Sequence, residues 1–403
     1  MSTHRRHAPT RSRPAARRRP GRLIALAACA LAVVPCVDAG RAGASSISTV
    51  SRSATTAPAS GVAVWSERFT INGASEQVFF AAIALSRHVR LGVGLANDHI
   101  GAADEPTSLV TTRTGAVAAV NADLFDFRGT GIPQGGAIVN GTVLKSPRPS
   151  WQAELTQFSD GRVAIGPVAY SAVVTGRTGV LERISSVNTP ADAEAGGVTE
   201  LTPAMAVVDL PSTCVEVTAA PSGSSWRLSA ARTVSRIVAV APGRWALLGC
   251  HAAATELRRR FPSAATASFS RKITATAAHP GEQVATMISG TRVLLHNGAS
   301  FRDTGGFTTW GRNPETFACV ARGGGRVLLG VIDGRREGAA GVTLGELTDY
   351  LRWRGCWDAL AFDGGGSSTI AERAAGQRAH VLNVPADWGY ERPVGDVLLV
   401  LHR

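Results

Sequence analysis

Asp363 is the residue of this 403-residue chain whose setting most strongly suggests chemistry. A short apolar segment, Ala359–Phe362, ends at this carboxylate, and three glycines and three hydroxyl residues follow it, Gly364–Thr369. Consecutive glycines let backbone N–H groups turn toward an anion without interference from a Cβ atom. A carboxylate beside such a loop suits chemistry on a negatively charged substrate, although an ordinary turn after a strand has a similar pattern.

Two further predicted strands end in acids or amides. Asp333 follows one of them, and the segment from Asn121 to Asp126 directly follows Ala116–Val120. The carboxyl edge of a parallel sheet is where ligands tend to bind. We therefore expect Asn121, Asp333 and Asp363, together with Arg312, to line one cleft, although Asp and Asn are also common strand terminators.

The elements that must position these residues are mostly strands. Short apolar runs bounded by Gly, Pro, Asp and Asn predict strands at Val78–Leu85, Val89–Leu95, Ala116–Val120, Arg162–Ile165, Ile237–Val240 and Arg292–Leu295. The middle of the chain, residues 168–290, is β-rich with one predicted helix, Ala252–Phe261.

The last hundred residues predict a hairpin followed by a strand–helix–strand unit. Thr316–Ala321 and Arg326–Ile332 are predicted strands joined by a glycine-rich turn. Thr343 and Glu346 have the spacing of a capping box that begins a helix, and Gly355 ends it. Strand, helix and strand in this spacing predict a βαβ unit with parallel strands. The predicted fold class is therefore α+β, with a mixed β-sheet core, a C-terminal βαβ unit and a β-rich middle segment.

Residues 1–44 have the layout of a secretory signal peptide. An arginine-rich start is followed by the apolar run Leu23–Val37 and by small residues, Ala42–Ala44, that suit cleavage. An uncleaved anchor is the main alternative, and membrane contact is expected only in that case. Most of the net charge of +12 comes from this segment, so we do not expect nucleic-acid binding. Residues 45–60, rich in Ser, Thr and Ala, predict a flexible linker, and residues 61–403 one domain.

Four cysteines follow the predicted signal: Cys214, Cys250, Cys319 and Cys356. An even number in an exported chain predicts one or two disulfides, with three connectivities for two bridges. None of the four has the C-x-x-C spacing of a zinc site, so we expect no metal, and we expect no other cofactor.

Seven motifs occur in order along the chain and together resemble the phosphodiester glycosidase family. They are Val120–Phe127, Pro133–Gly141, Gly311–Thr316, Val331–Arg335, Gly341–Leu347, Phe362–Thr369 and Glu391–Val400. The resemblance runs from about residue 116 to the C-terminus and is loose over residues 168–290. It implies an extracytoplasmic glycosidase, secreted or associated with the cell envelope, that hydrolyses the sugar C1–O bond of sugar-1-phosphodiesters. One departure is Glu315, where the family usually has an arginine; if that arginine binds the phosphate, Arg312 must replace it.

The residue types fit this reaction. Cleavage of the C1–O bond expels a phosphomonoester, a better leaving group than an alcohol, so neutralising the phosphate charge matters more than a strong general acid. Arg312, Arg335 or Arg392, together with the N–H groups of the glycine loop, could neutralise that charge. We predict that Asp363 attacks or activates water, with Asp333 as second candidate and Asn121 beside them. The predicted substrate-binding residues are Asp126, Arg312, Thr316, Gly364, Gly365, Gly366, Ser367, Ser368 and Arg392. The carboxylate separation that decides between retention and inversion is not given by the sequence.

Two other classes of function remain. A non-catalytic surface module of the same fold that binds glycans or serves a structural role is slightly favoured by Glu315. A phosphodiesterase that cuts the P–O bond would usually need a metal cluster, and the sequence has no dense His/Asp motif. The expected partner is a carbohydrate or glycan phosphodiester, and Trp388 is the best candidate among the tryptophans for a sugar platform.

Overall fold

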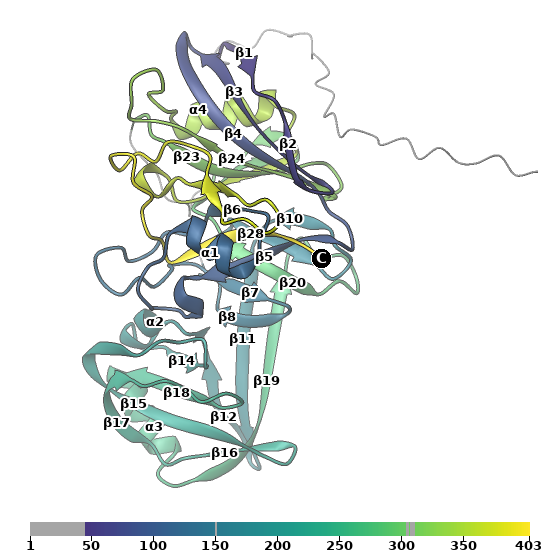
Figure 1. Ribbon diagram of the computed structural model, residues 1–403. Coiled ribbons are helices and arrows are strands. Elements are labelled where there is room, and N and C mark those ends of the chain that lie inside the picture. The colour runs from purple at the N-terminus through teal and green to yellow at the C-terminus, as the bar shows by residue number, and fades with distance from the viewer. Residues whose placement is uncertain (1–44, 150, 304–305, 307–310) are drawn as a thin grey trace, which may run out of the picture. The chain divides into compact units, whose positions relative to one another are not determined.

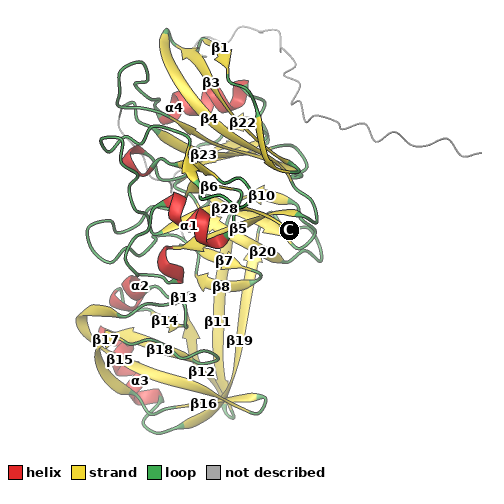
Figure 2. Ribbon diagram, viewed as in Figure 1, coloured by secondary structure: helices red, strands yellow, loops and turns green. Residues whose placement is uncertain are grey.

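Strands are the main regular secondary structure of this protein, with short helices between them (Figure 2). The computed structural model describes residues 45–149, 151–303, 306 and 311–403. The predicted signal segment, residues 1–44, lies outside the described residues. Within the described part, no helix combines the length and the apolar character needed to cross a membrane.

The first sheet carries the strands that lead to Asp363 and Asp333. Across it, neighbouring strands are β1 (Ile47–Arg52), β3 (Val62–Ile71), β4 (Ala74–Ala84), β24 (Arg326–Ile332), β23 (Glu315–Val320), β25 (Asp358–Ala361), β21 (Arg292–His296) and β22 (Ala299–Ser300), and β2 (Thr56–Ala59) also pairs with β3. Each of these pairings is antiparallel.

The predicted C-terminal βαβ unit and mixed sheet need a correction. Strands β24 and β25 run in the same direction, but β23 lies between them and is antiparallel to both. The glycine-rich turn after β23 closes a hairpin with β24, and this hairpin occupies one edge of β23. After helix α4 (Leu344–Trp353) the chain therefore adds β25 at the other edge. Because β23 separates β24 from β25, the two strands do not pair with each other, and the sheet stays antiparallel here.

Helix α4 confirms the predicted capping box. The Glu346 N–H donates to Thr343 Oγ1 at 3.1 Å, and the Thr343 N–H donates to Glu346 Oε2 at 3.0 Å. Gly355 follows the helix with a φ of 80°, the left-handed conformation that glycine adopts without strain. Leu347 and Leu351 are fully buried on the face that packs against the first sheet.

Two smaller sheets complete the region around the candidate site. The second contains β27 (His380–Val381), β26 (Ile370–Glu372), β6 (Ala118–Asn121), β28 (Asp396–His402) and β5 (Val89–Leu95). The third contains β10 (Val163–Ile165), β9 (Glu154–Phe158), β20 (Val284–Ser289), β7 (Ala137–Val139) and β8 (Thr142–Lys145).

One apolar core joins these three sheets. Its buried members include Leu329 and Leu360 from the first sheet, Val120 and Leu398 from the second, and Leu155 from the third. Burial of aliphatic side chains is the main force that holds sheets together. The core therefore fixes the ends of β6, β25 and β28 relative to one another.

The β-rich middle segment is confirmed and has a sheet of its own. The strands are β12 (Gly179–Ile184), β11 (Val168–Gly176), β19 (Ala265–Ala275), β16 (Ser225–Leu228), β15 (Val208–Ser222), β18 (Trp245–Cys250), β14 (Val198–Leu201) and β13 (Ser186–Val187), with β17 (Arg232–Ile237) beside β15. Long strands β11 and β19 lie side by side (Figure 1). The short helices elsewhere are α1 (Thr107–Thr114), α2 (Pro190–Glu194) and α3 (His251–Arg260).

The four described cysteines form two disulfides. Cys214 pairs with Cys250 across the neighbouring strands β15 and β18. Cys319 of β23 pairs with Cys356, which follows α4, so this bridge ties the helix connection to the first sheet. The predicted even pairing is confirmed, and the tertiary structure selects one of the three connectivities.

Two sequence expectations fail at exposed strands. Residues 45–60, predicted as a flexible linker, contain β1 and β2, and both strands pair with β3. Their side chains are largely exposed, and Ser and Thr suit a solvent-facing edge strand as well as a linker. The strand predicted at Ile237–Val240 is β17, which ends at Ile237 because its pairing with β15 stops there.

Candidate active site

Asn121 holds the ends of several strands together. Its Nδ2 donates to the backbone oxygen of Asp363 at 2.7 Å, and its Oδ1 accepts from Thr316 Oγ1 at 2.7 Å and from the Thr369 N–H at 3.0 Å. The Asp363 N–H donates to the oxygen of Ala122 at 2.7 Å. Asn121 and Thr316 are fully buried and occupied, so they position Asp363 and do not reach a substrate. The predicted proximity of Asn121 and Asp363 is confirmed.

Asp363 lies at the mouth of the glycine loop with its charge only partly compensated. Burial raises its pKa to about 6, and the Ser367 hydroxyl, the Arg392 charge and the Gly364 N–H oppose this rise. A carboxylate with such a pKa is ionised at neutral pH and remains basic enough to accept a proton or to attack an electrophilic carbon. This is the environment expected of a catalytic carboxylate.

The loop is made of glycines because charged side chains lie against it. Gly365 has a φ of 64°, and a Cβ there would lie 2.9 Å from the Arg335 Nη2. A Cβ on Gly366 would collide with Arg392 and Asp387. Two guanidinium groups thus approach the loop backbone closely.

Arg335 is the guanidinium best placed to read an anion. It is exposed, and Asn313 Oδ1 accepts hydrogen bonds from its Nε at 3.1 Å and its Nη2 at 2.8 Å. Among the described residues it forms no ion pair within 4.0 Å. Arg392 is half-buried and more strongly engaged, since it pairs with Asp387 at 2.6 Å and donates to Ser367 Oγ at 3.3 Å. Arg335 is one of the three arginines that the sequence offered for neutralising the phosphate.

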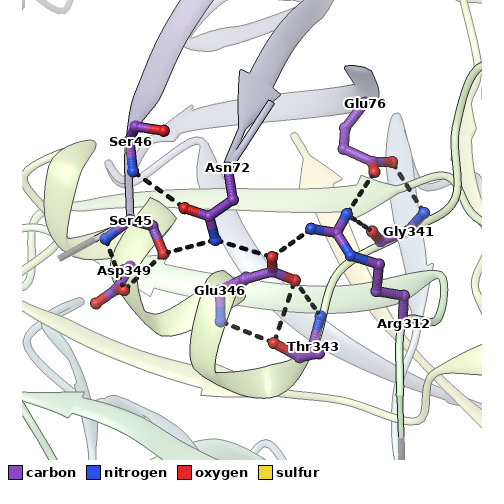
Figure 3. Close-up of polar contacts among 9 residues, drawn as sticks. All are labelled: Ser45, Ser46, Asn72, Glu76, Arg312, Gly341, Thr343, Glu346 and Asp349. Atoms are coloured by element: carbon purple, nitrogen blue, oxygen red, sulfur yellow. Dashed lines mark hydrogen bonds and ion pairs between the residues drawn. The ribbon is translucent and has the colours of Figure 1, made fainter. Parts of the chain in front are cut away.

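Arg312 does not have the role predicted for it. Figure 3 shows its guanidinium between Glu76 and Glu346, which it binds together with the backbone oxygen of Gly341. Glu76 is fully buried and also accepts the Gly341 N–H at 2.9 Å. Arg312 therefore neutralises a buried carboxylate and ties β4 to the start of α4.

Asp333 and Asp126 also have local partners. Asp333 is fully buried, pairs with Arg336 at 2.5 Å, and accepts the Val384 N–H at 3.1 Å. Asp126 is exposed and accepts the Thr130 N–H at 2.8 Å within a turn. These contacts account for both carboxylates, so we no longer favour Asp333 as a catalytic group or Asp126 as a substrate ligand.

Ser368 completes the loop. It is fully buried, and its backbone oxygen accepts the Asn383 Nδ2 at 3.0 Å. Its hydroxyl, like that of Thr369, has no hydrogen-bond partner within the described part of the chain. Buried hydroxyls without partners are uncommon and often mark a functional region.

The sequence patterns did not predict a buried charged cluster behind Asp363. Its members are Asp123, Lys145, Glu154 and Asp396, each at most 2% exposed. The Asp123 N–H donates to Asp396 Oδ1 at 2.9 Å, and Lys145 Nζ donates to the Gly135 oxygen at 2.8 Å. Asp123 and Asp396 lie in recognised motifs, but ordinary strand termini have the same sequence pattern.

Comparison with known protein families gives one match, in the C-terminal part of the chain. Residues 255–401 match the phosphodiester glycosidase family. The resemblance seen in the sequence motifs is confirmed over this segment, which contains Asp363, Arg335 and Arg392. No curated protein matches the chain.

Solved structures share the fold. A hypothetical protein from Synechocystis aligns with a TM-score of 0.68 and 18% identity over 85% of this chain. The chain covers 62% of that protein. An exported-protein candidate from Burkholderia pseudomallei aligns with a TM-score of 0.65 and 19% identity, over 83% of this chain and 76% of that one. Identities of this size show the fold alone.

The zebrafish N-acetylglucosamine-1-phosphodiester alpha-N-acetylglucosaminidase catalytic domain, auto-inhibited by its pro-peptide, aligns with a TM-score of 0.39 and 14% identity. The alignment covers 89% of this chain and 83% of that domain. This likeness is too weak to carry an argument.

Glu315 is the position at which this chain departs from the phosphodiester glycosidase motif. The side chain is almost fully buried, and a Cβ on Gly364 would lie 2.7 Å from its Oε2. A carboxyl group thus lies against the glycine loop. Arg335 and Arg392, not Arg312, supply the guanidinium groups beside this loop.

One group in the described residues has ligand atoms close enough for a metal, and it consists of Glu194 with Cys214 and Cys250. Because these cysteines form a disulfide, they have no thiolate to offer a metal ion.

Proposed function

We propose that this protein is a hydrolase that cleaves the C1–O bond of sugar-1-phosphodiesters. The observation that carries the proposal is Asp363, a carboxylate with a raised pKa, beside a glycine loop approached by Arg335 and Arg392. The family match over residues 255–401 supports a glycosidase-like function. The substrate class and the reaction are those that the resemblance to this family implies, and the charges at the site are compatible with them.

In the proposed reaction the substrate phosphate lies against the glycine loop. Arg335 and the loop N–H groups would bind its oxygens, since charge-assisted hydrogen bonds favour a phosphate strongly. Arg392 adds positive charge and holds the Ser367 hydroxyl toward Asp363. The C1–O bond breaks, and the phosphomonoester leaves with the electron pair.

Asp363 either attacks C1 or removes a proton from the water that does so. In the first case a glycosyl ester forms and water hydrolyses it; in the second, water adds directly. In both cases water supplies the hydroxyl group at C1, and its proton is taken up by a carboxylate or by the released phosphate. The products are the free sugar and a phosphomonoester.

Two disulfides in the described residues fit an oxidising, extracytoplasmic compartment, secreted or at the cell envelope. Exposed aromatic side chains lie near the site: Trp388 and Tyr390 flank the Asp387 loop, and Arg392 lies over the Phe127 ring at 5.6 Å. Such rings suit contact with sugars. A glycan phosphodiester of a cell-envelope polymer is the substrate class that we infer.

The test is incubation of the purified protein with an N-acetylglucosamine-α-1-phosphodiester, with Asp363→Asn as matched control. We expect free sugar and phosphomonoester from the wild type and neither from the variant. Release of sugar-1-phosphate would mean cleavage on the other side of the oxygen and would overturn the proposal.

The second candidate is a non-catalytic glycan-binding module, and Glu315 is the observation that favours it. Its carboxyl group beside Gly364 opposes an anion on the loop if it is ionised. Equal binding of the phosphodiester by wild type and Asp363→Asn, with no turnover by either, would select this alternative.

A further inference from the structure

The buried cluster behind Asp363 has more acids than its one cation can balance. Asp123, Glu154 and Asp396 face Lys145 inside the protein. One oxygen of each carboxyl group has no hydrogen-bond partner among the described residues: Asp123 Oδ1, Glu154 Oε1 and Asp396 Oδ2. Three buried carboxylates with a single ammonium would carry a net negative charge, which burial strongly disfavours. The cluster must therefore hold protons at neutral pH.

The remaining contacts of the cluster are fixed. The Gly135 N–H donates to Asp123 Oδ2, and Ser289 Oγ donates to Glu154 Oε2 at 2.5 Å. A Cβ on Gly135 would collide with Ser289, so these two segments are packed tightly. The carboxyl groups cannot turn outward to water without breaking this packing.

Asp396 connects the cluster to the candidate active site. The carboxyl group of Asp396 accepts a hydrogen bond from the Asp123 N–H. The backbone oxygen of Ala122, the residue before Asp123, accepts one from the Asp363 N–H. The pKa of Asp396 is raised to about 7, mainly by burial and to a smaller extent by the charge of Asp363, while the Asp123 N–H and Lys145 lower it. As the pH rises, Asp363, with a pKa of about 6, therefore loses its proton before Asp396 does.

We propose that protonated Asp396 is a positioning residue of the active protein and that its ionisation at higher pH lowers the affinity of the site for an anionic substrate. The ionised form places a second negative charge behind Asp363, which weakens binding of a phosphodiester. This inference rests on the proposed function. The other charged groups that face the pair are Asp123 and Glu154, which oppose its ionisation, and Lys145, which favours it, with Arg148 near Lys145 and Arg392 near Asp363.

The first experiment is the pH dependence of kcat/KM for a sugar-1-phosphodiester between pH 5 and 9. The kcat/KM of the wild type should fall above neutral pH, where Asp396 loses its proton. Asp396→Asn should lack this alkaline fall and keep the acid fall that Asp363 causes. Asp209→Asn, at an exposed position in β15, is the control and should follow the wild type.

Lys145→Met is a second variant that does not depend on folding of Asp396→Asn. Loss of the cation should move the alkaline fall to higher pH, because Lys145 favours the ionised form of Asp396. An alkaline fall that is the same in the wild type and both variants would overturn the proposal, since a purely structural role does not move a pH profile.

A titration separates this inference from the proposed function. With carbon-13-labelled aspartate, carboxyl resonances of the wild type, Asp363→Asn and Asp396→Asn report the pKa of Asp396 without turnover. In Asp363→Asn, this pKa should fall, because the neighbouring negative charge is gone. If the pKa of Asp396 is the same in the wild type and in Asp363→Asn, the inference is wrong even if the wild type is active. If the pKa of Asp396 does change but the wild type has no turnover, the proposed function is wrong, and the electrostatic coupling of Asp363 and Asp396 is still established.

Discussion

At the scale of single residues, Asp363 differs from other strand-end carboxylates because its neighbours leave it basic. Asp363→Asn removes the charge with little change in volume, so we expect turnover of a sugar-1-phosphodiester to fall at least about a hundredfold. Binding of the uncleaved substrate should persist, since Arg335 and the loop N–H groups are intact. Single-turnover rates and calorimetric binding measure the two effects. If the variant keeps wild-type turnover, Asp363 is a turn residue.

Arg335 and Arg312 are a matched pair of guanidiniums with opposite expected roles. Arg335→Ala should weaken kcat/KM for a phosphodiester by about tenfold to a hundredfold, the range of one hydrogen bond to a charged group. A neutral aryl glycoside, which lacks the phosphate charge, should be affected much less. Comparable losses of kcat/KM on both substrates would show that Arg335 does not bind the phosphate.

At the scale of elements, Arg312 joins β4 to the first turn of α4 through Glu76 and Glu346 (Figure 3). Arg312→Ala leaves a buried carboxyl group without its cation and should reduce the free energy of unfolding by about 2–4 kcal/mol. Because Glu76 has a pKa raised to about 7, mainly by burial, the loss should be smaller at pH 5, where Glu76 takes up a proton. Urea unfolding of the wild type and the variant at pH 5 and at pH 8 measures this difference. A loss that is equal at both values would contradict the account.

The capping box of α4 gives a smaller effect at the same scale. Thr343→Ala removes the acceptor of the Glu346 N–H and should cost about 1 kcal/mol. Thr114→Ala is a comparison in α1, where the hydroxyl donates to a helix carbonyl and caps no free N–H. Urea unfolding should show the larger loss for Thr343→Ala, and the reverse order would argue against the capping role.

At the scale of the whole molecule, buried acids set the pH dependence of stability. Burial raises the pKa of Glu76, Glu154 and Asp396 to about 7, from usual values of 4.5, 4.5 and 3.8. Between these limits the folded state binds more protons than the unfolded state, so stability falls as the pH rises. We expect a higher Tm at pH 5 than at pH 8, measured by calorimetry at constant ionic strength. A Tm that rises over this interval would mean that the cluster is ionised in the folded protein.

The sequence by itself determined the local features of this protein. The capping box at Thr343, the hairpin of β23 and β24, and the turn at Gly355 follow from residue types a few positions apart. The family motifs located the Asp363 loop and the strand end at Asn121. Local backbone preferences act over such short distances whatever the rest of the chain does.

Only the tertiary structure decided which charged side chains remain available to bind a substrate. Arg312 and Asp333 have motif positions as suggestive as that of Arg335, but each has an ion-pair partner. Glu76, distant in the sequence, binds Arg312, and Arg336, three residues along the chain, binds Asp333. Asp396 is a second case. Its sequence pattern indicates only the start of a strand, and its chemical role depends on Asp123, Lys145 and Asp363, which the fold places beside it. The strand order around β23 also lay beyond the sequence pattern. Pairing of distant segments and desolvation of charges depend on what the fold brings together, and a linear pattern does not contain that information.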